Sequence, residues 1–455
     1  MPRSSDLLPF VGKILAILGP LCASRWTKSA LTLAISAPKC TFAGIMSTPL
    51  PVILPQRLRG TIQLPSSKSL SARALVLAAI SGGEMPLHLS DCDDTWAMQA
   101  ALQQGEGLID IQAAGTAMRF TTALFAARPG ADVTLTGTER MRQRPIGILV
   151  DALRSLGADI RYTDCEGCPP LHIRGRRLRG GRVRMSATVS SQYISALLLI
   201  APSLDEGLTL ELEGVIASRP YIDMTLGLLA AYGARAQWLD GQTLRVMPGL
   251  TAPERPFEIE ADWSAASYWY EMVALAPDGD ADIRLPRLRQ PSLQGDSVVA
   301  DLFRPLGVRT EWTAEGVRLT KMPRTQCNGV WEVDFSQCPD LAQTLVVAAA
   351  LFAVPFRFTG LASLRIKETD RIAALVAEMA KLGITLTPSA DSISYQPAAA
   401  APPPCLPPIR TYDDHRMAMA FAPAAYRYPT LSIADAGVVS KSYPSFWEDI
   451  QSLLR

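Results

Sequence analysis

The stretch Leu64-Pro-Ser-Ser-Lys-Ser-Leu-Ser-Ala-Arg73 decides how the rest of the chain is interpreted. It leads into an apolar run with helical spacing that ends at Gly82-Gly83, so it predicts a buried helix whose first turns carry Lys68, Ser69 and Arg73. The start of a helix presents free N–H groups and the positive end of the helix dipole. Basic and hydroxyl residues placed there favour a receptor for phosphate or carboxylate, although a capped helix with solvated basic residues has the same pattern.

The same kind of apolar helix, rich in small residues and opening with a polar residue or proline, recurs along the chain. Such helices are expected at 69–81, 116–127, 191–201, 264–275, 340–353 and 415–426. Each is followed by a more polar, amphipathic helix near 94–104, 146–156, 221–232, 297–306, 370–382 or 444–454. Successive apolar helices begin 47, 75, 73, 76 and 75 residues apart. The regular spacing, with strand-like runs such as 133–136 and 208–212, predicts an α/β chain of six repeated α+β units.

Six units divide naturally into two domains of three. We expect one domain at 65–261 and the other at 46–64 plus 262–455, with the active site in the cleft between them. Residues 1–45 are expected to be a non-structural N-terminal extension, because they are basic and their apolar run is too short to span a bilayer. This extension is either a targeting peptide or the product of a start codon upstream of Met46.

Composition limits the class of protein. The 455 residues are 48% hydrophobic and 19% charged with a formal net charge of +1, which is typical of a globular chain and does not predict a nucleic-acid partner. Eight cysteines are scattered without a disulfide framework, which indicates a reducing compartment. Cys165-Glu-Gly-Cys168 has no second cysteine pair and the chain has three histidines, so we expect a loop there and not a zinc site.

Charged and hydroxyl residues gather at the predicted helix starts. They lie within 68–73, 115–119, 140–146, 190–192, 218–221, 338–340, 367–371, 413–416 and 441–444. If the interior helices of both domains point their N-termini at one cleft, that cleft collects helix dipoles, lysines and arginines. Such a site would bind small polyanions.

Nine of these motifs resemble the 5-enolpyruvylshikimate-3-phosphate synthase family (3-phosphoshikimate 1-carboxyvinyltransferase), and they occur in the family's order. The matching segments are 64–69, 114–119, 144–146, 190–192, 218–223, 339–340, 367–371, 414–419 and 441–444. The resemblance implies a two-domain inside-out α/β barrel with three units per domain. It also implies transfer of the enolpyruvyl group of phosphoenolpyruvate to the 5-hydroxyl of shikimate 3-phosphate, with release of phosphate, in the shikimate pathway. It implies a cytoplasmic monomer without metal or organic cofactor and without a membrane or nucleic-acid partner.

The resemblance also implies roles for individual residues. Catalysis is expected from Lys68, from Asp340 as the base and from Glu368 in proton transfer at the methylene carbon. Shikimate 3-phosphate is expected to contact Lys68, Ser69, Arg73, Ser190, Ser191, Gln192, Ser218, Asp340, Ser363 and Lys367. Phosphoenolpyruvate is expected to contact Lys68, Gly115, Arg144, Gln192, Arg371, Arg416 and Lys441. Taken singly, Asp340 could equally be a helix acid, and Glu368 a surface charge paired with Lys367 or Arg371.

Two positions depart from the family pattern, since Ala113 and Ser363 stand where asparagine is usual, and each loses an amide near the substrates. The sister transferase that acts on UDP-N-acetylglucosamine uses a loop cysteine, and no cysteine lies between Cys92 and Cys165, so we reject that activity. The remaining alternative is a non-catalytic binder of shikimate phosphates. A binder needs the cations but has no use for Asp340 and Glu368 among them.

Overall fold

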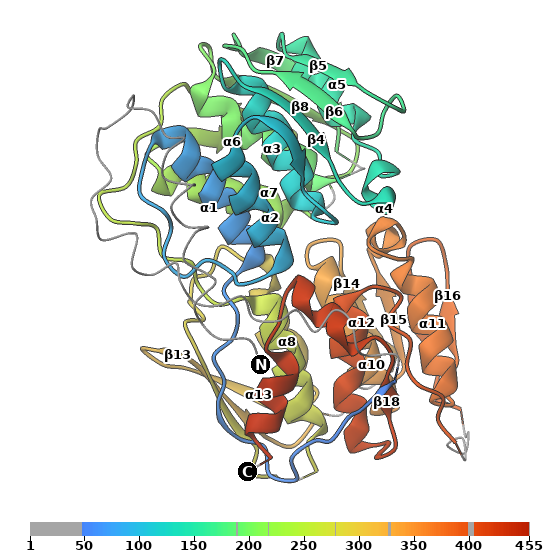
Figure 1. Cartoon of the computed structure of the whole chain (residues 1–455). Helices are drawn as coiled ribbons and strands as arrows, with labels where there is room; N and C mark the ends of the chain where they lie inside the picture. The colour runs from blue at the N-terminus through green and yellow to red at the C-terminus, as the bar shows by residue number, and fades with distance from the viewer. Residues whose placement is uncertain are drawn as a thin grey trace, which may run out of the picture. The chain divides into compact units, whose positions relative to one another are not determined.

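Figure 1 shows the computed structural model of the chain, which has an α/β fold. The structure describes residues 48–187, 190–216, 218–277, 279–325, 329–398 and 405–454. These residues belong to one compact unit, Met46–Arg455, and the expected extension at residues 1–45 lies outside the described part. No helix in the described part is both long and apolar enough to cross a bilayer.

Twelve helices lie where the sequence predicts them. The apolar six are α1 (Lys68–Ser81), α3 (Gly115–Ala127), α6 (Ser191–Ile200), α8 (Trp263–Leu275), α10 (Ala342–Leu351) and α12 (His415–Phe421). The amphipathic six are α2 (Asp93–Gln104), α5 (Gly147–Ser155), α7 (Arg219–Ala231), α9 (Val299–Phe303), α11 (Arg371–Lys381) and α13 (Phe446–Ser452). Several are shorter than predicted because prolines turn their ends into 3-10 turns, η3 (Ala201–Ser203), η5 (Pro339–Leu341) and η7 (Ala422–Tyr426).

Helix packing follows the alternation of apolar and amphipathic helices. The apolar helices α1, α3 and α6 contact one another, and α2, α5 and α7 each contact two of these three. The apolar helices α8, α10 and α12 form a second mutually contacting triplet. Gly157, Gly233, Gly307 and Gly383, the predicted helix ends, all have positive φ, which confirms the left-handed conformation expected there.

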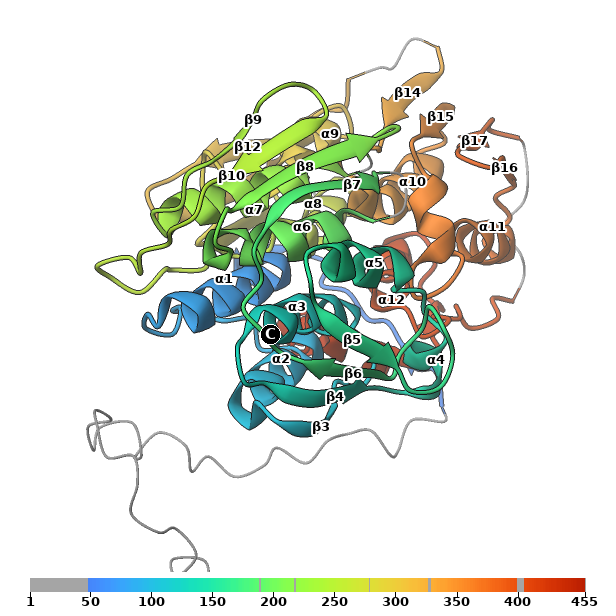
Figure 2. The same cartoon turned by 90° about the horizontal axis from the view of Figure 1, so that it is seen from above.

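Four four-stranded sheets repeat a single strand order. In each, a parallel pair of strands is followed by two antiparallel strands, in the orders β3-β4-β6-β5, β7-β8-β10-β9, β2-β11-β13-β12 and β14-β15-β17-β16. The first two sheets contain β3 (Gly107–Asp110), β4 (Asp132–Thr136), β5 (Asp159–Tyr162), β6 (Leu171–Arg174), β7 (Gly181–Ser186), β8 (Leu208–Glu213), β9 (Ala236–Trp238) and β10 (Thr243–Val246). The other two contain β2 (Arg59–Thr61), β11 (Asp282–Pro286), β12 (Val308–Trp312), β13 (Gly316–Lys321), β14 (Trp331–Asp334), β15 (Phe356–Thr359), β16 (Leu386–Pro388) and β17 (Ile393–Tyr395). Figure 2 shows β3–β6 beside α3 and β7–β10 beside α7, so helices cover the sheets.

The first and sixth helix pairs differ from the other four. In the described residues, the pair α1 and α2 has only two isolated strand bridges, Ser66 with Ala261 and Leu87 with Glu258. The pair α12 and α13 has a two-stranded sheet of β1 (Leu50–Pro51) and β18 (Ser432–Ile433). The short first repeat, 47 residues from helix to helix, leaves little chain for strands. The six predicted units are therefore unequal in strand content.

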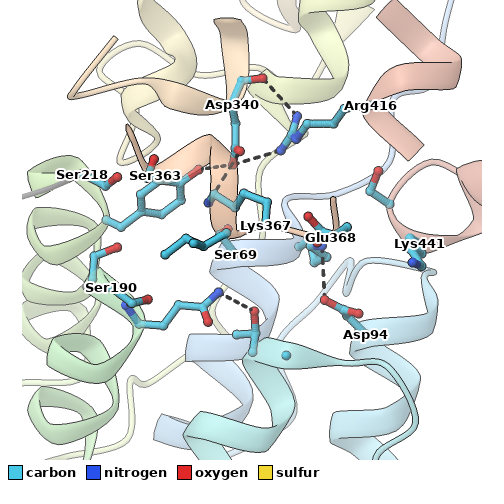
Figure 3. A pocket seen from close by; sticks show the side chains of 18 of the residues that line it. Ser69, Asp94, Ser190, Ser218, Asp340, Ser363, Lys367, Glu368, Arg416 and Lys441 are labelled. Atoms are coloured by element: carbon cyan, nitrogen blue, oxygen red, sulfur yellow. Dashed lines mark hydrogen bonds and ion pairs between the residues drawn. The ribbon is translucent and has the colours of Figure 1, made fainter. Parts of the chain in front are cut away.

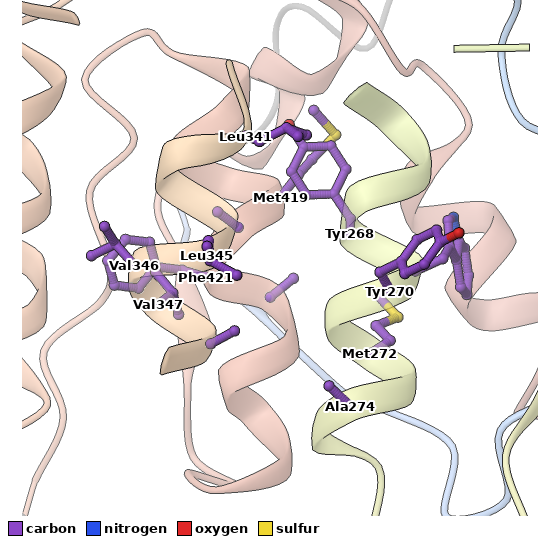
Figure 4. Close-up of a cluster of buried hydrophobic side chains, with 14 of the residues drawn as sticks. Tyr268, Tyr270, Met272, Ala274, Leu341, Leu345, Val346, Val347, Met419 and Phe421 are labelled. Atoms are coloured by element: carbon purple, nitrogen blue, oxygen red, sulfur yellow. The ribbon is translucent and has the colours of Figure 1, made fainter. Parts of the chain in front are cut away.

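Buried apolar side chains form two separate clusters. One, here called the first core, runs from Leu70 to Ile259. The other, the second core, combines residues 52–64 with residues 261–450. Figure 4 shows part of the second core, where Tyr268 of α8, Leu345 of α10 and Met419 of α12 lie near one another. Each core surrounds one triplet of apolar helices.

Glu271 is a carboxyl group inside the apolar second core. It lies on α8, its side chain is fully buried, and neither carboxylate oxygen has a hydrogen-bond partner in the described part of the chain. Burial raises the pKa of Glu271 well above its usual value, because there is no water to solvate the charge. Helix α8 therefore carries a neutral carboxylic acid that is unpaired and costs stability.

Glu271→Met should stabilise the protein, because methionine fills a similar volume without a polar group. An unpaired buried polar group costs about 1–3 kcal/mol, which sets the expected gain in the free energy of unfolding. The raised pKa means that wild-type stability falls as pH rises above the unfolded value, so the gain should be larger at pH 8 than at pH 5. Thermal melts at both pH values, with the exposed Glu332→Met as control, measure it; a lower melting temperature for Glu271→Met would contradict it.

Candidate active site

The starts of all six apolar helices line one cavity of about 470 Å³. Lys68 and Ser69 come from α1, Gly115 from α3, Ser191 and Gln192 from α6, Ser264 from α8, Asp340 from the turn before α10, and Arg416 from α12. Every residue that the sequence placed at a substrate or in catalysis lines this cavity. Figure 3 shows several of them, among them Asp340, Glu368 and Arg416. The motifs are hundreds of residues apart in sequence, and the fold brings them to one place.

The cavity wall has a large excess of positive charge. Ten lysines and arginines line it against four carboxylates, although the whole chain has a net charge of only +1. The carboxylates are Asp94, Asp262, Asp340 and Glu368. Concentrating cations and helix N-termini in a concave site favours ligands with several negative charges.

Asp340 lies at the centre of a cluster of donors. Its Oδ1 is 3.0 Å from Nη1 of Arg371, its Oδ2 is 3.0 Å from Nη2 of Arg416, and the Tyr221 hydroxyl donates to Oδ2 at 2.8 Å. Lys367 Nζ lies 3.9 Å from Oδ1. Burial would raise the pKa of Asp340, but Arg416, Lys367 and Arg371 outweigh it and hold the pKa well below its usual range. The side chain is a carboxylate at neutral pH.

Arg371 joins three carboxylates. Its side chain is only 2% exposed, and its Nε donates to Asp414 at 2.6 Å, its Nη1 to Asp340 at 3.0 Å and its Nη2 to Glu368 at 2.9 Å. Asp414 is itself buried and caps α12 by accepting from the Arg416 amide. Arg371 lines the cavity as expected, but its guanidinium is already occupied by protein carboxylates, so it fixes Asp340 and Glu368 relative to each other.

Glu368 and Lys68 face the cavity from opposite cores. Burial would raise the pKa of Glu368, but Arg371, His415 and Lys68 hold that pKa well below its usual range. Lys68 Nζ lies 3.2 Å from Oδ2 of Asp94, a residue of α2. Burial opposes the charge of Lys68, yet Asp94 and Glu368 more than offset it and raise the lysine pKa. Both side chains are therefore charged at neutral pH.

Two arginines surround the start of α3. Helix α3 begins at Gly115 without a side-chain cap. Arg119 donates to the Gly115 carbonyl oxygen at 2.7 Å. Burial lowers the pKa of Arg119, and the nearby positive charge of Arg144 lowers that pKa further. No ion pair with a carboxylate is found for either guanidinium in the described residues. An open helix start between two unpaired arginines is an anion site with room for a phosphate or carboxylate.

Arg73 supplies a third guanidinium without a carboxylate partner among the described residues. It is 2% exposed and donates to Thr225 Oγ1 at 2.8 Å, to Ser69 O at 2.9 Å and to Ser195 Oγ at 3.0 Å. Burial lowers the pKa of Arg73 to about 10, so the side chain stays protonated at neutral pH. Because no carboxylate of the described residues pairs with it, the positive charge of Arg73 is available to an anion bound in the cavity.

The predicted serines and glutamine occupy helix starts on the first-core side. Ser190 caps α6, and Gln192 donates from Nε2 to Thr116 Oγ1 at 3.2 Å. Ser218 precedes α7 with a positive φ of 56° and its N–H donates to Ser336 O at 3.0 Å. A non-glycine residue held in this conformation is typical of functional sites.

The remaining predicted residues lie on the second-core side. Lys441 donates from Nζ to the Asp413 carbonyl oxygen at 2.8 Å, and Lys367 approaches Asp340. Ser363 lines the cavity, as does Ala113 on the first-core side, so both departures from the family pattern are at the site itself.

Four neighbouring residues belong to the site although the sequence analysis gave them no role. They are Asp94, Arg119, Tyr221 and Asp414. Three of them, Arg119, Tyr221 and Asp414, fall inside the motifs that carry the resemblance, so these motifs could have identified them as site residues. Asp94 had none beyond its place in the first turn of α2, where acidic residues are common in any helix.

Comparisons with known proteins show the family to which the chain belongs. The family model described as EPSP synthase (3-phosphoshikimate 1-carboxyvinyltransferase) matches residues 52–105 and 97–450. A Bacteroides fragilis protein named 3-phosphoshikimate 1-carboxyvinyltransferase is 54% identical over 400 residues, covering 87% of this chain and 96% of that protein. A Bordetella avium protein of the same name is 37% identical, covering 86% and 95%.

A solved structure supports the fold. The EPSP synthase from Acinetobacter baumannii superposes with a TM-score of 0.68 at 22% sequence identity, covering 89% of this chain and 98% of that one. The match to the family model and the two relatives each extend over most of the chain. The chain belongs to the EPSP synthase (3-phosphoshikimate 1-carboxyvinyltransferase) family.

Proposed function

We infer that this protein is an enzyme that transfers the enolpyruvyl group of phosphoenolpyruvate to the 5-hydroxyl of shikimate 3-phosphate and releases phosphate. This is the reaction of 3-phosphoshikimate 1-carboxyvinyltransferases in the shikimate pathway. The observation that carries the inference is that Lys68, Asp340 and Glu368 meet in one cavity with a strong excess of cations. Both substrates carry a phosphate and a carboxylate, which suits such a wall.

The two halves of the cavity suit different substrates. We propose that shikimate 3-phosphate lies against Ser69, Arg73, Ser190, Ser191, Gln192, Ser218, Ser363 and Lys367. We propose that phosphoenolpyruvate lies against Gly115, Arg144, Gln192, Arg416 and Lys441, with Lys68 touching both and Arg371 holding the carboxylates behind them. The unpaired Arg119 and Arg144 beside Gly115 support this division, because a phosphate there would neutralise both.

The chemistry requires proton transfers in both directions. The hydroxyl adds to C2 of phosphoenolpyruvate while C3 gains a proton, and C3 then loses a proton as phosphate leaves. Asp340 takes the hydroxyl proton, and Glu368 with Lys68 serves C3. The guanidiniums that keep Asp340 ionised also make it a weak base in the empty site. An anionic substrate that engages Arg416 and Lys367 reduces their hold on Asp340 and raises its basicity.

A phosphate-release assay with both purified substrates tests the proposed function. We expect phosphate to appear only when shikimate 3-phosphate and phosphoenolpyruvate are both present, with the enolpyruvyl product identified by mass spectrometry. Binding of shikimate 3-phosphate without phosphate release would favour the alternative of a non-catalytic binder.

We also propose the architecture and setting that the resemblance implies. The protein is a two-domain inside-out α/β barrel of six units, a monomer of the cytoplasm, with one domain at 65–261 and the other at 46–64 plus 262–455. Two separate cores, two helix triplets and the pairing of β2 with β11 support the domain division. Limited proteolysis that releases a stable fragment near 65–261 would test it, and cleavage evenly across both cores would contradict it.

Gly115→Ala should weaken inhibition by glyphosate, which the resemblance places in the phosphoenolpyruvate pocket as a competitive inhibitor. A Cβ at Gly115 would lie 2.7 Å from Nη1 of Arg144 and 2.8 Å from Nη1 of Arg119, so both guanidiniums must shift. Both atoms are the far ends of flexible side chains, so the shift itself costs little and acts by moving the donors away from the bound anion. Weakening one hydrogen bond to a charged group costs about 1.5–3 kcal/mol, so we expect the inhibition constant to rise roughly 10- to 150-fold and the KM for phosphoenolpyruvate to rise less.

The control for this experiment is Gly241→Ala, where a Cβ meets nothing within 4 Å. Inhibition kinetics on the three proteins measure the effect. A wild type that is indifferent to glyphosate well above its KM for phosphoenolpyruvate would contradict the prediction and identify Ala113 as the cause.

A further inference from the structure

Cys165 and Cys168 form a thiol pair at the surface of the first core. Cys165 is exposed and Cys168 partly exposed, and the two residues stand at the two ends of one four-residue turn. The Cys168 N–H donates to the Cys165 carbonyl oxygen at 3.2 Å, which closes a turn with Gly167 at a φ of 85°. In the described part of the chain, no group of three or more histidine, cysteine or acidic residues is placed to hold a metal ion.

The turn is bonded to the segment that carries Arg144. The Gly167 carbonyl oxygen accepts from the Ile146 N–H at 2.8 Å, and a Cβ on Gly147 would lie 3.6 Å from the Gly167 Cα. The neighbouring Pro145 lines the active-site cavity together with Arg144. Residues 165–168 therefore contact the base of the loop whose tip forms part of the anion site.

A second contact fixes the same turn to helix α5. Glu166 Oε1 lies 3.5 Å from Nη1 of Arg154, and the Arg154 guanidinium lies over the Tyr162 ring, 5.0 Å from its centroid. Helix α5 begins directly after Ile146. The turn therefore contacts both ends of α5, through Ile146 before its first residue and through Arg154 in its last turn.

We propose that Cys165 and Cys168 are a reversible redox-modification site, and that closing their disulfide weakens phosphoenolpyruvate binding by displacing the loop of Arg144. The effect on substrate binding rests on the proposed function; the disulfide itself does not. Disulfide sulfurs are about 2.05 Å apart, much closer than two sulfur atoms that are not bonded to each other, so oxidation must tighten the turn. Tightening moves the Gly167 carbonyl, which lies between the two cysteines, relative to Ile146.

The co-reactant is a low-molecular-weight disulfide such as oxidised glutathione. The exposed Cys165 thiolate attacks one sulfur of this disulfide, forms a mixed disulfide and releases one glutathione thiol. Cys168 then attacks the Cys165 sulfur and releases the second glutathione. Two thiols are oxidised to one disulfide, and two electrons and two protons pass to oxidised glutathione. A dithiol reductant reverses both steps.

The test compares the full-length protein before and after treatment with oxidised glutathione. Peptide mass spectrometry should find a peptide joined at Cys165 and Cys168 that has lost two hydrogens. Steady-state kinetics should show a KM for phosphoenolpyruvate raised about two- to tenfold, as expected from one weakened hydrogen bond, with a smaller change in kcat. Hydrogen exchange should become faster at the Ile146 amide. Dithiothreitol should reverse all three changes.

Matched variants separate this site from the other cysteines. Cys165→Ser should abolish the response to oxidised glutathione, Cys168→Ser should stop at a mixed disulfide on Cys165 without the internal link, and the exposed Cys405→Ser should respond like the wild type. In the wild type, a stable mixed disulfide at Cys165, or no linkage of the two cysteines, overturns the proposal. A linkage that leaves both KM and Ile146 exchange unchanged overturns the coupling to Arg144. Absence of turnover in the reduced protein contradicts the proposed function. In that case peptide mass spectrometry still tests whether the disulfide forms, and hydrogen exchange still tests whether the disulfide changes the Ile146 amide.

Discussion

Asp340→Asn is expected to lower kcat by about two to four orders of magnitude, the range for removing a positioned general base. Asparagine keeps the shape of the side chain and can accept the hydrogen bond from Tyr221, but it cannot take a proton. Binding of shikimate 3-phosphate should survive, because Arg73 and the serines of α6 are untouched. The expected signature is a loss of kcat without a comparable loss of affinity.

Turnover and shikimate 3-phosphate affinity should be measured on the same preparations, the latter by calorimetry. Asp301→Asn is the matched control, because Asp301 of α9 is 75% exposed and lies 3.6 Å from Arg304, the residue after the helix end, in an exposed pair. Arg416→Ala should chiefly weaken phosphoenolpyruvate binding, although it also removes a partner of Asp340 at 3.0 Å. Equal losses of binding in the Asp340 and Arg416 variants would show that the division of roles is wrong.

Arg371→Met should both inactivate and strongly destabilise the protein. The guanidinium is 2% exposed and is the direct partner of Asp414, Asp340 and Glu368, of which Asp414 is fully buried. Removing one member of a buried ionic network leaves the others uncompensated, at a cost of about 3–5 kcal/mol. Denaturant unfolding at neutral pH measures this loss.

The pH dependence of the Arg371 variant follows from the lowered pKa values of Asp340 and Glu368. In the wild type these carboxylates contribute stability above their unfolded pKa values, and that contribution is lost as pH falls through the lowered folded values. Without Arg371 both folded pKa values rise, so the carboxylates protonate at higher pH and the unpaired charge disappears. The stability difference between variant and wild type should therefore be largest at neutral pH and shrink in acid.

Arg304→Met provides the control, since its exposed pair with Asp301 should contribute less than about 1 kcal/mol. A variant at Arg371 that melts like Arg304→Met would show that the carboxylates find other partners. Crystallography of the variant would then be expected to show Asp414 turned toward a different cation.

The sequence predicted the helices well because helix starts, helix ends and apolar faces depend on local patterns. Gly157 and Gly383 mark helix ends by a backbone conformation that other residues adopt at a cost, so they can be identified without the structure. Lys68 and Asp340 are found by motifs at helix starts, and the fold places both in the same cavity. In such cases a short segment contains all of the physical information.

Long-range pairing could not be predicted in the same way. The partnership of Lys68 with Asp94, and of Arg371 with Asp414, depends on how separate helices pack, and no local pattern encodes it. The role of Arg371 as a phosphoenolpyruvate contact stays a prediction, and its three carboxylate partners could not be read from the motif alone. The sequence showed that the first repeat is short, at 47 residues. Only the strand pairing showed that this unit has fewer strands than the others.

The pairing of β2 with β11 has a consequence for synthesis of the protein. Arg59, on β2, donates to the carbonyl oxygen of Asp280, which is 221 residues away, and a Cβ at Gly60 would lie 2.6 Å from a methyl carbon of Leu453. The ribosome therefore releases β2 before the first core, and its strand partner β11 only after that core. The first core can complete during elongation, while β2 keeps an unpaired strand edge until β11 has emerged.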